Sequence, residues 1–211
     1  MPDASITLEG KSEAKTAATR QKIVAGARRH FLAQGFRNVT MDDLAAELGM
    51  SKKTLYAHFA SKTDLVRAVM IGKLDEAEAE LEAITSRTDT GFAESLHDLL
   101  ACVQRVGDEI KPPFVRDVRR DTPELFSIVE ERRSMMIHTH FDRVLKAGRK
   151  AGMIRKDVPV RLIVEILVGA TQAIVNPQKL MELGLTPKAA YSTVISIVLN
   201  GVFTATGKAS L

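Results

Sequence analysis

Residues 52–58 bring together side chains that can bind phosphate oxygens and the edges of bases. Lys52 and Lys53 are cationic, and Thr54, Tyr56 and His58 carry hydrogen-bond donors. Hydroxyl and imidazole donors suit phosphate oxygens, whereas a lysine can also donate to guanine O6 or N7 in the major groove. These residue types at this spacing predict a surface that binds double-stranded DNA.

A helix must position these side chains, because Leu55 and Phe59 are four residues apart and fall on one helical face. That face turns towards a core, so the polar residues point the other way. Ala57 is small enough for close approach to DNA or for contact with a thymine methyl group. In this geometry the outward side chains are Lys53, Thr54 and Ala57. Lys52 and Tyr56 lie on one flank of this face, and His58 lies on the other.

Short helices joined by tight turns are expected around this segment. A first helix is indicated by apolar residues that recur every four positions and is ended by a glycine: Ile23, Ala27, Phe31 and Gly35. Hydroxyl residues are the predicted N-caps of the next three helices. Thr40 caps a helix that ends at Gly49, Ser51 caps a helix over Lys52–Phe59, and Ser61 caps a helix that begins at Lys62. The arrangement is typical of a helix-turn-helix bundle. The helix N-termini at Thr40 and Lys62 also offer N–H groups to phosphates.

Charge is distributed unevenly along the chain. From Lys11 to Lys62 there are ten basic and four acidic residues, whereas Thr63 to Leu100 holds three basic and nine acidic ones. A basic block beside an acidic one favours a polyanion-binding module attached to a segment that stays off the polyanion. Chance clustering of solvated faces is the alternative that charge alone leaves open.

The stretch Thr19 to Arg67, with T-M-D-D-L-A-A-E-L-G-M-S-K-K-T-L-Y-A-H-F-A-S-K-T-D-L over Thr40 to Leu65, resembles the DNA-binding domain of the tetracycline-repressor-like (TetR/AcrR) transcriptional regulators. The resemblance implies phosphate contacts by Thr40, Tyr56, His58 and Lys62. It implies base contacts by Lys52, Lys53 and Thr54, next to Ser51. Many members have a small residue in place of Lys53, so a purely electrostatic role for Lys53 stays open. The alternative is that Thr54 and Tyr56 only cap and pack.

The remaining chain fits the helical regulatory domain of that family. Further helices are expected over about 92–110, 114–120, 123–150, 157–175 and 186–203, and no sheet is predicted. The fold class is therefore all-α, with about nine helices. The expected division is a flexible arm over residues 1–17, a helix-turn-helix domain over 18–64 and a ligand-binding and dimerisation domain over 65–211.

The last two expected helices, the eighth and the ninth, carry apolar residues almost all the way round. A surface helix needs only one apolar stripe, so a second surface of each must be buried. The resemblance favours burial in a homodimer, as a four-helix bundle across a two-fold axis. Packing within one chain is the alternative.

An effector pocket is expected among the fourth to eighth helices. Mostly apolar walls with a few polar groups are typical of small-molecule cavities. The candidate wall residues are Leu99, Cys102, Val103, Phe114, Met136, His140, Ile166 and Thr171. A solid core of the same composition is the alternative for each of them.

Catalytic and metal sites find little support. His138 and His140 lie two apart on a helix and point about 200° away from each other, so they cannot share a metal with Asp142. No Walker loop, dinucleotide fingerprint or nucleophile elbow is present. We expect no enzyme activity, no cofactor and no metal, and we interpret Cys102 as a small buried residue rather than a redox sensor.

The sequence also predicts a cytoplasmic protein. A single cysteine needs no oxidising compartment, and the first twenty residues lack the apolar core of a signal peptide. The most apolar stretch, Leu162 to Val175, is too short for the ~20 residues that span a bilayer.

The leading hypothesis is a ligand-responsive transcriptional regulator, most simply a repressor. It would bind a pseudo-palindromic operator as a homodimer and be released by a small-molecule effector. An architectural DNA-binding protein without an effector is the alternative, and a closed regulatory domain without a cavity would favour it. A helical enzyme or carrier that keeps the DNA motif as a relic is a third hypothesis.

Overall fold

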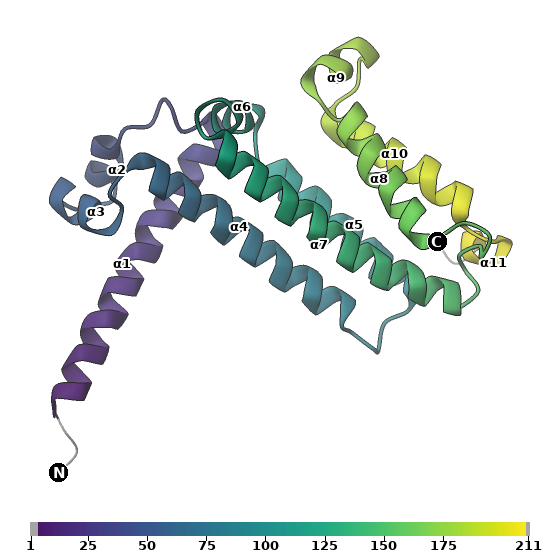
Figure 1. Cartoon of the computed structure of the whole chain (residues 1–211), viewed down its shortest axis with the longest axis horizontal. Coiled ribbons are helices and arrows are strands. Elements are labelled where there is room, and N and C mark those ends of the chain that lie inside the picture. Colours follow the sequence, from purple (N-terminus) through teal and green to yellow (C-terminus); the bar gives the residue numbers. More distant parts are fainter. Residues whose placement is uncertain (1–3, 210–211) are drawn as a thin grey trace. The chain divides into compact units, whose positions relative to one another are not determined.

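The computed structural model describes residues 4–209, with side chains for 13–176 and 178–209. Over this range the regular structure consists of eleven α-helices and one isolated β-bridge, between Ile154 and Phe203 (Figure 1). The all-α prediction is confirmed. The chain divides into two compact units, one comprising residues up to Lys73 together with Ile110–Phe126, the other comprising Leu74–Glu109 and Ser127–Leu211.

The first unit is built from four complete helices and the beginnings of two others. The complete helices are α1 (Ala4–Gln34), α2 (Met41–Glu47), α3 (Lys52–His58) and α6 (Pro112–Asp121), and the partial ones are the first half of α4 (Lys62–Thr85) and the first four residues of α7 (Pro123–Lys150). Their apolar faces meet in one core, in which the side chains of Ile23, Phe31, Leu44, Leu55 and Leu65 are almost completely buried. The predicted helix-turn-helix arrangement is therefore confirmed.

Helix α1 begins earlier than the sequence indicates. The structure extends it back to Ala4, across the segment for which a flexible arm is expected. Residues 13–18 of this helix are exposed, so packing does not account for the helix over these residues. Sequence periodicity predicts a helix from its apolar face, and residues 13–18 have none.

Helix α6 completes the first unit although it lies far away in the sequence. The Lys111 N–H donates to the Leu32 carbonyl at 2.9 Å, and the rings of Phe36 and Phe114 pack edge to face. The buried Asp117 carboxylate accepts a hydrogen bond from the Arg37 N–H at 3.2 Å. Gly35, with φ of +85°, allows this approach, because a Cβ there would lie 2.4 Å from Asp117 Oδ2.

The second unit is a layered bundle of the remaining helices. It contains the second half of α4, α5 (Phe92–Glu109), most of α7 (Pro123–Lys150), α8 (Val160–Ile174), α9 (Pro177–Leu183), α10 (Pro187–Val202) and α11 (Ala205–Ala209). Arg132 of α7 forms ion pairs with Asp75 and Glu78 of α4 at 2.7 and 2.9 Å. Arg105 of α5 pairs with Glu80 of the same helix α4. The acidic face of α4 is thus neutralised by its neighbours.

Two helices of the second unit differ from the expected set. Helix α9 begins with an N-cap from Asn176, whose side chain accepts from the Lys179 N–H, and ends at Gly184 with φ of +63°. The five-residue α11 follows α10. Their presence raises the number of helices above the expected nine, whereas the division at residues 17 and 64 stays a prediction.

Candidate nucleic-acid interface and ligand cavity

Side-chain caps fix the ends of α2 and α3. Thr40 Oγ1 accepts from the Asp43 N–H at 3.0 Å, and the Asp43 carboxylate accepts from the Thr40 N–H at 3.3 Å, which closes a capping box. Ser51 Oγ accepts from the Thr54 N–H at 3.0 Å. Both predicted caps are confirmed. Because Thr40 and Ser51 are also exposed, capping leaves them accessible on the surface.

Helix α3 presents an exposed polar face, as its periodicity predicts. Leu55 and Phe59 are 0% and 3% exposed, whereas Tyr56 is 47% exposed. The other exposed residues of α3 are Lys52, Lys53, Thr54 and Ala57, and His58 is half-buried. The structure thus brings the predicted DNA-contacting residues of α3 to one accessible surface.

The two lysines at the start of α3 have different surroundings. Lys52 Nζ lies 2.6 Å from Oδ2 of Asp42 on α2, and this hydrogen bond raises the pKa of Lys52. Lys53 makes no hydrogen bond or ion pair with any residue that the structure describes. Lys53 is therefore the cation of α3 that is immediately available to a polyanion.

Lys62, a predicted phosphate contact, is engaged inside the first unit. Its Nζ donates to the carbonyls of Phe36 and Val39 at 3.1 and 3.0 Å, and approaches that of Arg37 at 3.4 Å. It also lies 5.8 Å from the centroid of the Phe36 ring. The ammonium thus ties the turn between α1 and α2 to the start of α4. A direct phosphate contact by Lys62 stays a prediction.

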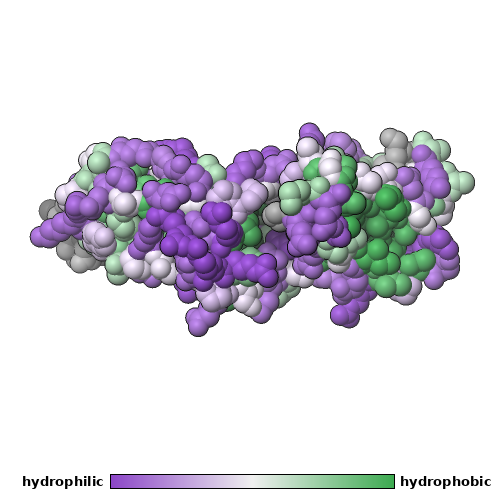
Figure 2. Space-filling view, turned by 90° about the horizontal axis from the view of Figure 1, so that it is seen from above, coloured by the Kyte–Doolittle hydropathy of each residue, from purple (hydrophilic) through white to green (hydrophobic). Residues whose placement is uncertain are grey.

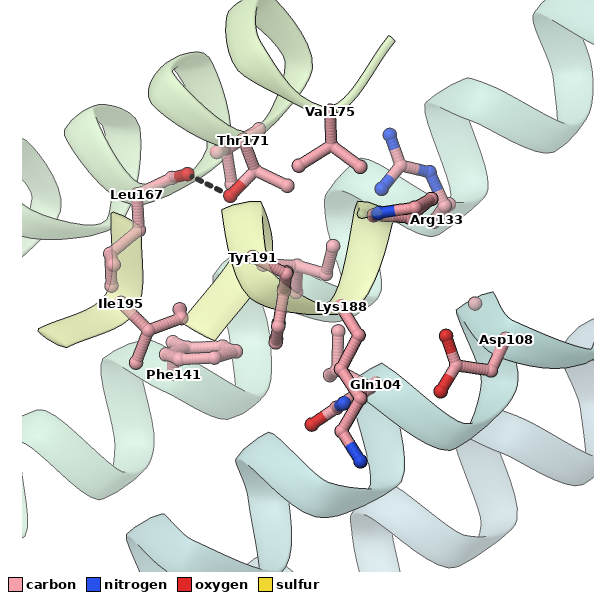
Figure 3. A pocket seen from close by; sticks show the side chains of 15 residues that line it. Gln104, Asp108, Arg133, Phe141, Leu167, Thr171, Val175, Lys188, Tyr191 and Ile195 are labelled. Carbon is pink, nitrogen blue, oxygen red and sulfur yellow. Dashed lines mark hydrogen bonds between the residues drawn. The ribbon is translucent and has the colours of Figure 1, made fainter. Parts of the chain in front are cut away.

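A cavity of about 200 Å³ lies within the second unit, lined by α5, α7, α8 and α10 (Figure 3). Its wall includes Val103, Gln104, Arg133, Phe141, Leu167 and Tyr191. Most of these surfaces are apolar. The Thr171 hydroxyl at the wall donates to the Leu167 carbonyl at 2.7 Å, so it is already satisfied within α8.

The predicted pocket residues are only partly brought together. Val103 and Thr171 line this cavity. Phe114 belongs to the first unit, and Ile166 is 45% exposed. The remaining four pack in the interior away from the cavity wall: Leu99, Cys102, Met136 and His140. The wall residues on α10, such as Tyr191 and Ile195, are absent from the predicted set.

The histidines of α7 lie on different sides of the helix. His140 is buried, and its Nδ1 lies 2.9 Å from Thr85 Oγ1 on α4. Burial, assisted by Arg143, lowers the pKa of His140. His138 instead lies 3.9 Å from Glu165 on α8. Within the described part of the chain, no group of three His, Cys, Asp or Glu side chains could hold a metal ion.

Cys102 is a buried thiol. Burial, with Glu80 nearby, raises the pKa of Cys102 to about 11. The protonated form is therefore favoured, as expected for a small interior residue rather than a reactive thiolate.

Helices α8 and α10 pack against each other and still leave apolar side chains uncovered. The exposed ones include Leu162 and Ile166 on α8 and Ile197 on α10, the last being 68% exposed. Figure 2 shows a broad hydrophobic area at the right of the view. None of the described helices is both long and apolar enough to cross a membrane.

Residues 23–69, which contain α2, α3 and the start of α4, match the family model for bacterial regulatory proteins of the tetR family. The chain is 30% identical to the HTH-type transcriptional repressor Rv1474c of Mycobacterium tuberculosis over 149 residues, which cover 70% of this chain and 75% of the relative.

Two solved structures with the same fold contain small molecules. A transcriptional regulator from Saccharomonospora viridis in complex with choline is 19% identical, with a TM-score of 0.69 over 89% of this chain and 99% of that one. The complex of SmeT, a repressor from Stenotrophomonas maltophilia, with triclosan is 18% identical, with a TM-score of 0.66 over 89% and 93%. With its helix-turn-helix unit and its likeness to Rv1474c, the chain belongs to the tetR family of bacterial transcriptional regulators and not to an enzyme family.

Proposed function

We propose that this regulator is a repressor that acts in the cytoplasm, binds a pseudo-palindromic operator as a homodimer and is released by a small-molecule effector. The observation that carries the proposal is the exposed face of α3. Lys53, Thr54 and Tyr56 are exposed there, whereas Leu55 is buried in the core. Repression is favoured because relatives such as Rv1474c are named as repressors.

DNA binding is tested with duplexes from the neighbourhood of the gene, by fluorescence anisotropy at several salt concentrations. Tyr56→Phe removes one phosphate donor, so affinity should fall about equally on operator and random DNA. Lys52→Ala should instead relax the preference at one base pair. Lys208→Ala, at an exposed lysine of α11, is the matched control. Equal losses on both DNAs for Lys52→Ala would remove Lys52 from the base-contacting set.

The homodimer is supported by the apolar side chains that α8 and α10 leave exposed, since contiguous exposed apolar surface marks interaction sites. A symmetric dimer places two copies of α3 on one face of the duplex. The half-sites should then lie about one helical turn apart, or a multiple of it. Footprinting of the operator measures this spacing directly.

The cavity in the second unit supports an effector-controlled regulator over an architectural DNA protein, for which a closed domain is expected. An effector must bind the released conformation more tightly than the DNA-bound one. A typical coupling of ~1 to 3 kcal/mol changes operator affinity some 5- to 150-fold.

A cavity-filling variant tests this role once an effector is found by thermal-shift screening. Val103 lies on the cavity wall, so Val103→Phe should abolish the response to the effector and leave operator binding intact. Ala101→Phe adds the same ring to an exposed position of α5 and should respond normally. Normal release of DNA by the Val103→Phe variant would place the effector elsewhere.

A further inference from the structure

Three of the polar side chains that line the cavity lie on one side of it. Figure 3 shows Gln104 and Lys188 together there, near Asp108, while Phe141, Leu167 and Ile195 lie opposite them. A ligand that fills this space should be amphipathic, with an apolar body against Phe141, Leu167 and Ile195 and a polar group towards Gln104 and Lys188.

The charged side chains that line the cavity differ in their partners. Arg133 donates two hydrogen bonds to Glu130, at 3.1 and 2.8 Å, so its charge is already neutralised. Asp108 has an interaction partner within the chain. Lys188 lines the cavity and is exposed, and it forms no ion pair or hydrogen bond with any described residue, so its ammonium is available to an anionic group that enters from solvent.

Uncharged donors accompany this cation. Burial raises the pKa of Tyr191 above its usual range, so the phenol stays protonated and can donate a hydrogen bond. No described residue accepts a hydrogen bond from the Tyr191 hydroxyl or the Gln104 amide. Both residues are half-buried, so these donors are open to a ligand, and together with an available ammonium they are suited to an anionic oxygen.

The volume indicates how much of a ligand the cavity can enclose. A cavity of about 200 Å³ is smaller than the roughly 300–1,000 Å³ of pockets for drug-sized molecules. An apolar cavity of about 150 Å³ is sufficient to hold benzene. The space therefore fits about one ring with a short side chain.

We propose that the cavity binds a small monocarboxylate with an apolar body of about one ring, whose carboxylate meets Lys188, Gln104 and Tyr191. This inference rests on the proposed function, because it names the chemical class of the effector. Lys188 is the one cationic residue of the described cavity lining without an ion-pair partner, which matches a monoanion.

Three probes with the same apolar body and different charge test the proposal on the full-length protein: 3-phenylpropionate, 3-phenylpropanamide and 3-phenylpropylamine. Binding is measured by calorimetry and by the shift in Tm. The acid should bind about tenfold more tightly than the amide or the amine, because hydrogen bonds to charged groups are the stronger ones.

Substitutions of the cavity residues test which side chains bind the carboxylate. Lys188→Gln should weaken binding of the acid about tenfold and leave binding of the amide unchanged, whereas Lys188→Arg should retain most of the affinity for the acid. Tyr191→Phe should weaken binding of the acid less, because a neutral donor is lost. Lys208→Gln, at an exposed lysine outside the cavity, is the control.

Several results would overturn the proposal: no binding of the acid at millimolar concentration, equal affinity for all three probes, tightest binding of the amine, or full affinity for the acid in Lys188→Gln. Release of operator DNA is measured separately. An acid that binds in a Lys188-dependent way without releasing DNA would support the ligand class and contradict the proposed effector role.

Discussion

The Nζ of Lys52, the first residue of α3, lies 2.6 Å from the Oδ2 of Asp42 in the first turn of α2. Both side chains are more than half exposed, so solvent screens the pair and it adds little to stability. The ion pair instead affects DNA binding, because Lys52 must leave Asp42 before it can donate a hydrogen bond to a base.

Asp42→Asn should therefore strengthen DNA binding. The substitution frees Lys52 and removes a negative charge near the phosphates, so affinity should rise several-fold at low salt and the salt dependence should steepen by up to about one counter-ion. Titrations at several salt concentrations measure both. Glu47→Gln removes the same charge from α2 but releases Arg29 rather than Lys52, so it is the comparison for a cation outside α3. An equal rise in both variants would mean that release of Lys52 has no effect beyond that of lost negative charge and a freed cation.

Lys62→Ala separates two roles for that residue. Loss of the bonds from its ammonium to the carbonyls of Phe36 and Val39 should lower Tm as well as DNA affinity. A direct phosphate contact would in addition reduce the salt slope by about one. Lys53→Ala should reduce that slope and leave Tm unchanged, because Lys53 has no partner among the described residues. Unchanged Tm in Lys62→Ala would contradict a role in holding the turn.

The first unit was largely predictable from the sequence because its signals are local. The caps Thr40 and Ser51 and the buried Leu55 follow from residue type and helical period, and the structure confirms all three. The short α9 carries a similar signal, Asn176 followed by a proline, although the periodicity gives no helix there.

The contacts between distant segments were not predictable in the same way. Asp42 and Lys52 are ten residues apart on different helices, and no periodicity joins them. Tyr191 was missed on the cavity wall because α10 is apolar almost all round. Such a pattern predicts that each face of the helix is buried, but it does not predict which residues or ligands contact that face.

Ile197→Asp tests the proposed homodimer with little risk to the fold, since Ile197 is 68% exposed in one chain. A charge there should cost several kcal/mol of association free energy if the position is buried in the interface, and should yield a folded monomer with poor operator affinity. Val198 is half-buried, so Val198→Asp would disturb the monomer as well. Sedimentation of the wild-type and variant proteins at micromolar concentration measures the change. A monomeric wild type would exclude this dimer.

Cys102 should be unreactive in the folded protein. With a pKa of about 11, well above that of a free thiol, hardly any thiolate is present at pH 8. Its reaction with a thiol reagent should therefore be slow in buffer and immediate in denaturant.

The raised pKa of Cys102 also sets the sign of a pH effect. The folded state holds the thiol proton more tightly than the unfolded state, so the contribution to stability is complete below pH 9 and is lost as the pH rises through about 11. Cys102→Ala should flatten the decline in Tm over this range. An identical decline in the variant would contradict the assignment.

The contact of Asp117 with Gly35 and Arg37 has a consequence for biosynthesis. The ribosome delivers the chain from the N-terminus, yet the unit that carries α3 is closed by α6, a segment of residues 112–121. Until that segment emerges, Phe36 lacks its partner Phe114 and the Arg37 N–H lacks its acceptor. The nascent chain therefore cannot complete its DNA-binding unit until Asp121, the last residue of α6, has been translated, and premature termination before α6 would release a fragment with an open core.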